Sequence, residues 1–302
     1  MSVKYTVLKV LVRKLNIKNK WDLDADKIVE IKKKQNAKVR IPKLHSEEIE
    51  VSRIEVMCFS LLKMKHHLRS EKACMFIIGG GMVSAPRPDS VKKALRFAKE
   101  TGLDVYVPYY PLCTEYPISK SYEMIFETYK EMLKDYEGKS ISLLGTSSGG
   151  NLALGLIPYM NDIGSKLERP GFIMPISPGT CPRDEEEIRR MKELDQKDVA
   201  IPMSYMFTAE TIMRHGQEVP DYMLHLQNGD FSNCPEVCFI YGSDETLYAF
   251  APSFEESMKK YGVKYRMIVG QGMFHCYPVF PIVPESKDGW DQMVELAKKG
   301  DL

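Results

Sequence analysis

Short apolar segments alternate with helical patterns along most of this 302-residue chain. Parallel strands need helical crossovers and are buried on both faces, so the alternation predicts an α/β protein with a mostly parallel sheet and helices on both sides. The expected strands span 73–78, 104–109, 140–144, 172–176, 237–241 and 265–269, and the expected helices span 89–100, 119–136, 149–160, 251–261 and 285–299.

Three parts of the chain depart from this alternation. Residues 47–62 alternate apolar and polar side chains as strands do, and residues 3–15 and 22–35 have helical spacing. Residues 178–235 contain two helical patterns and no convincing strand. Such an insertion is expected at the strand ends, where it would form a lid.

The net charge of +1 conceals a segregation of charge along the chain. Residues 1–43 contain 13 Lys and Arg but only 4 Asp and Glu, a local charge of +9, whereas residues 44–302 carry −8. The near-neutral total argues against a generic nucleic-acid binder, which carries a basic excess. Charge asymmetry of this kind is found in membrane-facing arms, in nucleic-acid arms and in segments that dock on the acidic body of their own chain.

Targeting signals and metal-binding patterns are not evident. The first 20 residues lack the apolar core and cleavage site of a signal peptide, and no apolar run approaches the roughly 18 residues of a spanning helix. Seven cysteines, an odd number without a C-x-x-C pair, indicate neither a disulfide framework nor a zinc site. We expect reduced thiols in a cytoplasmic protein, with no metal and no organic cofactor.

The strongest chemical signal is Gly145-Thr146-Ser147-Ser148-Gly149, which lies between a predicted strand and a predicted helix. A G-x-S-x-G sequence in that context forms a sharp turn that raises the serine hydroxyl above the sheet edge. The glycines let the backbones approach closely, and the helix N-terminus offers free N–H groups to a developing negative charge. Ser147 is therefore the candidate nucleophile.

An oxyanion hole is predicted from Ile78-Gly79-Gly80-Gly81, at the end of an earlier strand. Three glycines let the backbone bend so that its N–H groups point at one oxygen, together with the N–H of Ser148. The expected donors are Gly80, Gly81 and Ser148.

The candidate base and acid follow from their positions along the chain. Of six histidines, His275 alone follows the last predicted strand, on a loop that would return over the serine. The acid is expected after the penultimate strand, where Asp244 and Glu245 are adjacent. One of these carboxylates would orient His275 and stabilise its protonated form.

Taken in order, these motifs resemble the hormone-sensitive-lipase-like branch of the α/β hydrolases, esterases related to bacterial acetyl esterases and carboxylesterases. The resemblance covers about residues 70–300 and rests on I-G-G-G, on Y-P-L with Glu115, and on G-T-S-S-G-G-N-L-A, G-S-D-E-T-L and G-M-F-H. It implies an α/β-hydrolase fold with a mostly parallel central sheet and a helical cap. It also implies Glu245 as the acid, by its position after the glycine, with Asp244 as the alternative.

The resemblance further implies how the chain is divided. Residues 1–45 would form N-terminal cap helices, and residues 179–235 would form a cap insertion. The hydrolase core would then consist of residues 46–178 and 236–302.

Two residues depart from the family pattern. Ile78 stands where the family usually has His before the glycines, which removes a side-chain tether for that loop. Thr146 stands where the family usually has Asp before the nucleophile. Neither change removes a catalytic group.

Together these features predict a serine hydrolase that cleaves carboxylic esters through an acyl-enzyme intermediate. Met82, Met203, Met206 and Phe207 are candidate pocket residues, and a pocket lined by them would suit short or medium acyl chains. An amidase or formamidase on the same triad differs only in the leaving group. A peptidase and a non-catalytic binding protein with this fold are further alternatives.

The expected partner is a small-molecule ester, with no nucleic acid. Pairing of the strand 265–269 between two copies would form a homodimer. We expect the basic residues 1–43 to dock against the acidic stretch 184–198 of the insertion. The alternative is peripheral attachment of residues 1–20 to anionic lipid.

Overall fold

The computed structural model describes residues 2–301, and its centre is one eight-stranded sheet. The strands are β1 (Ile49–Val56), β2 (Phe59–His66), β3 (Ala73–Ile77), β4 (Asp104–Pro108), β5 (Ile141–Thr146), β6 (Phe172–Ile176), β7 (Glu236–Gly242) and β8 (Tyr265–Gly270). Their order is β1-β2-β4-β3-β5-β6-β7-β8, with β2 antiparallel to both neighbours and all other pairs parallel. The predicted mostly parallel sheet is confirmed.

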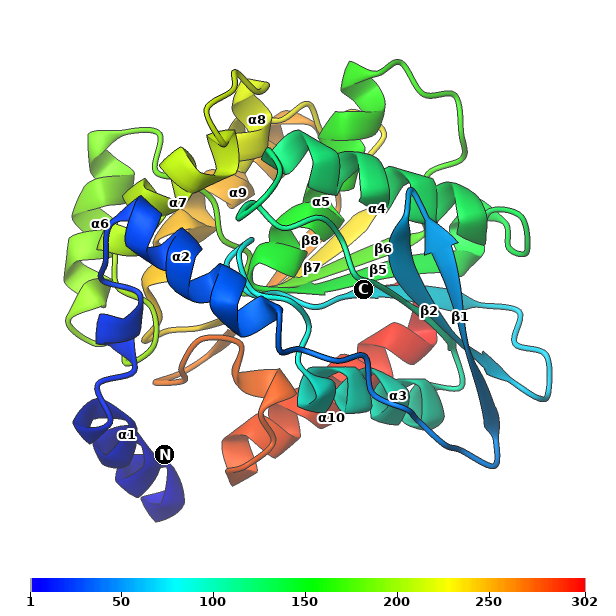
Figure 1. Ribbon diagram of the computed structural model, residues 1–302, viewed down its shortest axis with the longest axis horizontal. Helices are drawn as coiled ribbons and strands as arrows, with labels where there is room; N and C mark the ends of the chain where they lie inside the picture. Colours follow the sequence, from blue (N-terminus) through cyan, green and yellow to red (C-terminus); the bar gives the residue numbers. More distant parts are fainter. Residues whose placement is uncertain (1, 302) are drawn as a thin grey trace.

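Helices cover both faces of the sheet (Figure 1). On one face lie α4 (Ile118–Met132), α5 (Ser148–Asp162) and α9 (Ala251–Lys260), and on the other lie α3 (Pro88–Thr101) and α10 (Pro284–Lys299). Because successive strand residues point to opposite faces, Leu143 and Leu144 of β5 are buried in two different clusters. The two cores hold the sheet between the helical layers, as the apolar strand runs required.

The antiparallel pair β1 and β2 is longer than the sequence pattern indicated. The alternation was expected to run through Cys58, but Met57 and Cys58 instead form the turn, with backbone φ of 51° and 67°. Two consecutive left-handed residues match the twist of a tight hairpin. The turn therefore divides the expected segment 47–62 into two strands.

The remaining helices gather around the ends of the central strands (Figure 1). They are α1 (Val3–Lys14) and α2 (Ala25–Asn36) from the N-terminal segment, and α6 (Glu185–Asp195), α7 (Ser204–Arg214) and α8 (Asp221–Leu224) from the insertion. Helix α2 packs against α7, so the two groups meet although they are far apart in sequence. Two of the insertion helices match the predicted patterns, whereas the four-residue α8 had no signal of its own.

Contacts between the N-terminal segment and the insertion are mainly aromatic and polar. The rings of Trp21 and Tyr205 meet edge to face at 4.8 Å, and Ser204 donates to the carboxylate of Asp22 at 2.6 Å. Within residues 2–301, a single ion pair, Lys18 with Asp195 at 2.8 Å, joins the basic segment to the acidic stretch 184–198. The expectation that much of the basic charge of residues 1–43 pairs with the acidic stretch 184–198 is therefore wrong. Ion pairs are not the main contact between the N-terminal segment and the insertion.

Helix α1 packs against the rest of the protein through one of its sides only. Tyr5 is buried, donates to the carbonyl of Gly272 at 2.6 Å and stacks on Phe274. The opposite side leaves apolar side chains exposed, namely Val7, Val10, Leu11 and Leu15. Across residues 2–301, no helix combines the length and the apolar character that crossing a membrane requires.

Candidate active site

The predicted nucleophile lies at a strained turn between β5 and α5. Ser147 has φ 52° and ψ −126°, a conformation that L-residues rarely adopt. A Cβ on Gly145 would come within 2.0 Å of the carbonyl oxygen of Gly149, and one on Gly149 within 2.1 Å of that of Ile77. Only glycines allow the three segments to approach this closely, and the serine is thereby held at the strand end.

Beside the turn, His275 and Glu245 form a close pair. The Nδ1 atom of His275 lies 2.5 Å from Oε2 of Glu245, whose carboxyl group is fully buried. The other oxygen, Oε1, accepts from the hydroxyl of Ser177 at 2.7 Å and from the N–H of Gly242 at 2.8 Å. The carboxylate is thus held in one orientation, aimed at the imidazole.

Asp244, the alternative acid, points elsewhere. Its carboxylate forms an ion pair with Lys9 of α1, and its side chain is partly exposed. Of the two adjacent acids, the structure therefore brings only Glu245 against His275. Ser177, which orients Glu245, was not predicted, because its only signal was its position after a buried strand.

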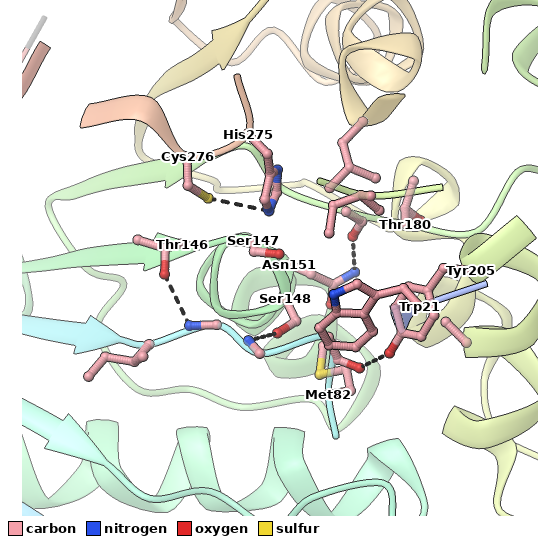
Figure 2. A pocket seen from close by; sticks show the side chains of 18 of the residues that line it. Trp21, Met82, Thr146, Ser147, Ser148, Asn151, Thr180, Tyr205, His275 and Cys276 are labelled. Carbon is pink, nitrogen blue, oxygen red and sulfur yellow. Dashed lines mark hydrogen bonds between the residues drawn. The ribbon is translucent and has the colours of Figure 1, made fainter. Parts of the chain in front are cut away.

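The imidazole and the serine hydroxyl face the same pocket, with His275 above Ser147 in Figure 2. They are not hydrogen-bonded to one another: Nε2 of His275 lies 3.5 Å from the sulfur of Cys276, and within residues 2–301 the Ser147 hydroxyl has no hydrogen-bond partner. Burial disfavours the imidazolium, but the contacts with Cys276 and Glu245 outweigh it and raise the pKa of His275 well above its usual range.

The glycine loop is tied to the serine turn by two hydroxyl groups. Gly79 donates its N–H to Oγ1 of Thr146 at 3.0 Å, and Gly80 donates to Oγ of Ser148 at 2.9 Å (Figure 2). Thr146 is one of the two departures from the family pattern. Its hydroxyl, with that of Ser148, gives the loop the attachment that a His at position 78 would otherwise offer.

Two tyrosines from other elements also form hydrogen bonds with the glycine loop. Tyr110 donates to the carbonyl of Ile78 at 3.0 Å, and Tyr205 of α7 donates to the carbonyl of Gly81 at 2.5 Å. The loop is therefore held from the core and from the insertion together. Neither tyrosine had a sequence signal that connected it to the glycines.

The three expected oxyanion donors are not equivalent. The N–H of Gly80 is already bonded to Ser148, whereas those of Gly81 and Ser148 have no acceptor among the residues that the structure describes. Both unpaired donors belong to residues that line the pocket. They are therefore the amides available to an oxygen bound above Ser147.

The pocket has a volume of about 240 Å³ and a mostly apolar wall. Met82 and Met206 line it, as expected, but Met203 and Phe207 do not. The correction follows from helix geometry: α7 presents Met206, Ala209 and Met213, which share one face, while the neighbouring Phe207 is 42% exposed. Met203 lies at the start of the helix, outside the lining.

Several lining residues were not predicted from the sequence. They include Trp21, Lys93, Asn151, Thr180, Tyr205 and Cys276. They come from separate elements, and no local pattern distinguishes them from core or surface residues. Among residues 2–301, no three His, Cys, Asp or Glu side chains are grouped so that they could hold a metal ion.

The sequence profile of one protein family, described as alpha/beta hydrolase fold, matches residues 74–279. An acetyl-hydrolase from Streptomyces hygroscopicus is 24% identical to this chain over 227 residues, which cover 72% of this chain and 73% of the relative.

Solved structures with similar folds include three esterases. An esterase/lipase from an uncultured bacterium superposes with a TM-score of 0.79 at 19% identity, over 99% of both chains. EstE5, soaked with p-nitrophenyl butyrate, gives 0.81 at 18% identity over 99% of both chains. An esterase from the bacterial hormone-sensitive lipase family gives 0.74 at 21% identity, over 91% of this chain and 97% of the other. At such identities the likeness establishes the fold.

Proposed function

This chain belongs to the α/β-hydrolase-fold family, and from that premise we propose that it is a carboxylesterase-like serine hydrolase acting through Ser147, Glu245 and His275. The observation that carries the proposal is the buried Glu245 carboxylate held against His275, in one pocket with a serine on a strained turn. Serine, base and orienting acid in this arrangement are the parts of acyl-transfer catalysis.

The reaction begins when Ser147 attacks the ester carbonyl and His275 accepts its proton. Glu245 stabilises the resulting imidazolium. The N–H groups of Gly81 and Ser148 receive the developing oxyanion, and Gly80 adds a third donor if the Ser148 hydroxyl turns aside. His275 then gives its proton to the departing alcohol, which leaves an acyl-enzyme.

Water completes the cycle. His275 removes a proton from a water molecule that attacks the acyl-enzyme, and the proton then returns to Ser147 as the carboxylic acid leaves. The imidazole must turn from its contact with Cys276 toward the serine hydroxyl in the first step and toward the attacking water in the second. Catalytic hydrogen bonds are often absent or long in apo enzymes and form when substrate binds.

Replacement of Ser147 by Ala tests the assignment directly. We expect turnover of p-nitrophenyl butyrate to fall by about three orders of magnitude or more, because the nucleophile is lost. The variant should also lose labelling by a fluorophosphonate probe. Unchanged hydrolysis would contradict the proposal, and a wild type inert to both reagents would favour a non-catalytic binding protein.

The pocket supports esters with short or medium acyl chains. Its volume of about 240 Å³ and the apolar side chains that α7 contributes to its wall, Met206, Ala209 and Met213, support this substrate class. Amide hydrolysis on the same triad is the second candidate, because the leaving group alone distinguishes it. Matched ester and anilide substrates compared side by side decide between them.

The two-part cap remains part of the proposal. The edge-to-face contact of Trp21 with Tyr205, and their shared position on the pocket wall, support a cap made of residues 1–45 and 179–235 over a core of 46–178 and 236–302. We also keep a cytoplasmic location as a prediction. Strand β8 is at the sheet edge, which suits the homodimer pairing proposed for 265–269.

Peripheral membrane contact through residues 1–20 stays an alternative role for α1. The exposed apolar side of that helix supports it. Cosedimentation with vesicles of phosphatidylserine and phosphatidylcholine, for the full chain and for a deletion of residues 1–20, tests this role. Equal sedimentation of the two proteins would exclude it.

A further inference from the structure

One wall of the catalytic pocket carries a lysine. Lys93, in the first half of α3, lines the same cavity as Ser147 and His275. Its side chain is half-buried, and its Nζ lies 3.9 Å from the centre of the Phe280 ring. The stem of the lysine is therefore packed, and the ammonium is held at a defined place in the pocket wall.

The ammonium has no acidic partner in the part of the chain that the structure describes, since no carboxylate lies within ion-pair distance. The neighbouring Lys92 differs: it is exposed and pairs with Asp89 at 4.0 Å. Loss of water lowers the pKa of Lys93, although the charge of Asp89 acts in the opposite direction. A partly desolvated cation without a counter-ion leaves an interaction for a ligand to satisfy.

Lys93 lies in a corner formed by α3 and the loop after His275. Phe280, Val279 and Ser90 from the same two segments also line the pocket, and the Ser90 hydroxyl is a second polar group there. The wall that α7 contributes, which is the cap end of the pocket, carries the apolar side chains of Met206, Ala209 and Met213. In Figure 2, Cys276 from the His275 loop and Trp21 from the cap side lie on opposite sides of Ser147.

This layout gives the two ends of an ester different surroundings. A substrate whose carbonyl lies above Ser147 extends one substituent toward the apolar cap end and the other toward the α3 corner. The cap end favours an apolar substituent, because burial of apolar area is favourable. The α3 corner favours an anionic substituent, because Lys93 is a cation.

We propose that Lys93 binds an anionic group, a carboxylate or a phosphate, on the ester substrate, so that this enzyme prefers acidic esters over neutral ones. The proposal rests on the ester hydrolysis proposed above and adds the substrate class. Lys93 acts in binding and selection and takes no part in proton transfer.

Pairs of esters that differ only in charge test the preference. For an anion on the alcohol side, 4-acetoxybenzoate is compared with its methyl ester, and 4-acetoxyphenyl phosphate supplies the phosphate arm. For an anion on the acyl side, mono-4-nitrophenyl succinate is compared with its methyl ester. The quantity measured is the ratio of kcat/KM for the anionic ester to that for its neutral match.

Lys93→Met is the test variant, and Lys92→Met is the matched control on the exposed side of α3. We expect the charge ratio of the wild type to exceed one for at least one pair and to fall about tenfold in Lys93→Met, as loss of one charge-assisted contact predicts. Lys93→Arg should restore most of the ratio, and Lys92→Met should leave it unchanged.

Different failures have different meanings. If neutral esters are hydrolysed but Lys93→Met lowers both members of every pair equally, Lys93 has only a packing role and the inference is overturned, while the esterase function stands. If the wild type hydrolyses no ester, calorimetric binding of 4-acetoxybenzoate to Ser147→Ala, with and without Lys93→Met, still decides the role of Lys93. Equal binding by the two proteins would overturn it.

Discussion

The backbone N–H of Gly80 donates to the side-chain hydroxyl of Ser148 at 2.9 Å, so one predicted oxyanion donor is bonded within the protein itself. The hydroxyl belongs to the residue directly after the nucleophile. An alanine at this position would leave the amide free to point at the substrate oxygen. The same hydrogen bond also holds the glycine loop in place. Its loss would therefore both free a donor and make the loop less ordered.

Ser148→Ala should therefore release a donor. We expect kcat for p-nitrophenyl butyrate to rise several-fold, up to about tenfold, because a preorganised oxyanion donor stabilises the transition state. KM should change little. A fall in kcat would mean instead that the hydroxyl serves catalysis by holding the loop.

Thr146→Val tests the second hydrogen bond that holds the glycine loop, from the N–H of Gly79 to the Thr146 hydroxyl. It leaves the N–H of Gly79 without its acceptor and should reduce the free energy of unfolding by about 1–3 kcal/mol. Urea denaturation of this variant, of Ser148→Ala and of the wild type separates the structural effect from the catalytic one. Equal stability of Thr146→Val and wild type would show that the hydrogen bond between Gly79 and Thr146 contributes little to stability.

Glu245→Gln should lower kcat by about 10³- to 10⁴-fold. The amide cannot stabilise the imidazolium and favours the wrong tautomer of His275. Asp244→Asn is the control from the adjacent position and should keep kcat within about twofold, because its side chain pairs with Lys9. A large loss in Asp244→Asn with little loss in Glu245→Gln would reverse the assignment of the acid.

The pH dependence of kcat/KM should reflect the raised pKa of His275. The base acts only when neutral, so activity should rise with pH through a value above 6.5 and be lost at lower pH. For stability the sign is opposite: the protonated imidazole contributes fully below its unfolded pKa, and this contribution is lost as pH rises through the folded one.

Cys276→Ala should shift that activity profile to lower pH, because the sulfur contact is one cause of the raised pKa. Cys181→Ala is the matched control, since this buried thiol also lines the pocket but contacts the carbonyl of Met206 instead. Coincident profiles for Cys276→Ala and the wild type would assign the shift to Glu245 alone.

Chain-length preference should depend on Ala209. A phenylalanine there would narrow the pocket at the wall that α7 contributes, so Ala209→Phe should retain acetate hydrolysis but lose hexanoate and octanoate hydrolysis by at least about tenfold. Phe207→Ala, on the exposed side of the same helix, should leave the series unchanged. A p-nitrophenyl ester series measures both, and a parallel change in the two variants would reject this orientation of α7.

Tyr5 connects α1 to the loop that carries His275. Tyr5→Ala should destabilise the protein by about 2–4 kcal/mol, since it removes a buried ring and a bond to Gly272. Leu11→Ala, on the exposed side of α1, should have almost no effect. Thermal unfolding measures both changes, and a stable Tyr5→Ala variant would show that α1 is dispensable.

The elements that could be predicted were those encoded by neighbouring residues. The serine turn and the glycine loop each depend on a few consecutive residues, since tight backbone approach requires glycine wherever it occurs. Alternating apolar runs likewise indicated the parallel sheet, because burial on both faces requires them. His275 followed from chain order.

Contacts between elements that are far apart in the chain were harder to predict from the sequence. Met203 and Phe207 were assigned to the pocket because composition alone does not reveal which side of a helix faces inward. The basic segment was expected to dock by charge, yet Trp21 and Tyr205 make the central contact with the insertion. Exposed ion pairs contribute little, whereas burial of large rings contributes more.

The sequence by itself determined the fold class, and it indicated Ser147, His275 and the glycine loop as the parts of the proposed site. Each of these depends on local turn chemistry or on strand and helix order. The resemblance favoured Glu245 over Asp244, and the tertiary structure places Glu245 against His275. Only the tertiary structure decided that Ser148 occupies the N–H of Gly80 and that Lys93 lies in the pocket wall. Those outcomes depend on how elements far apart in the chain pack together, and no short segment specifies that packing.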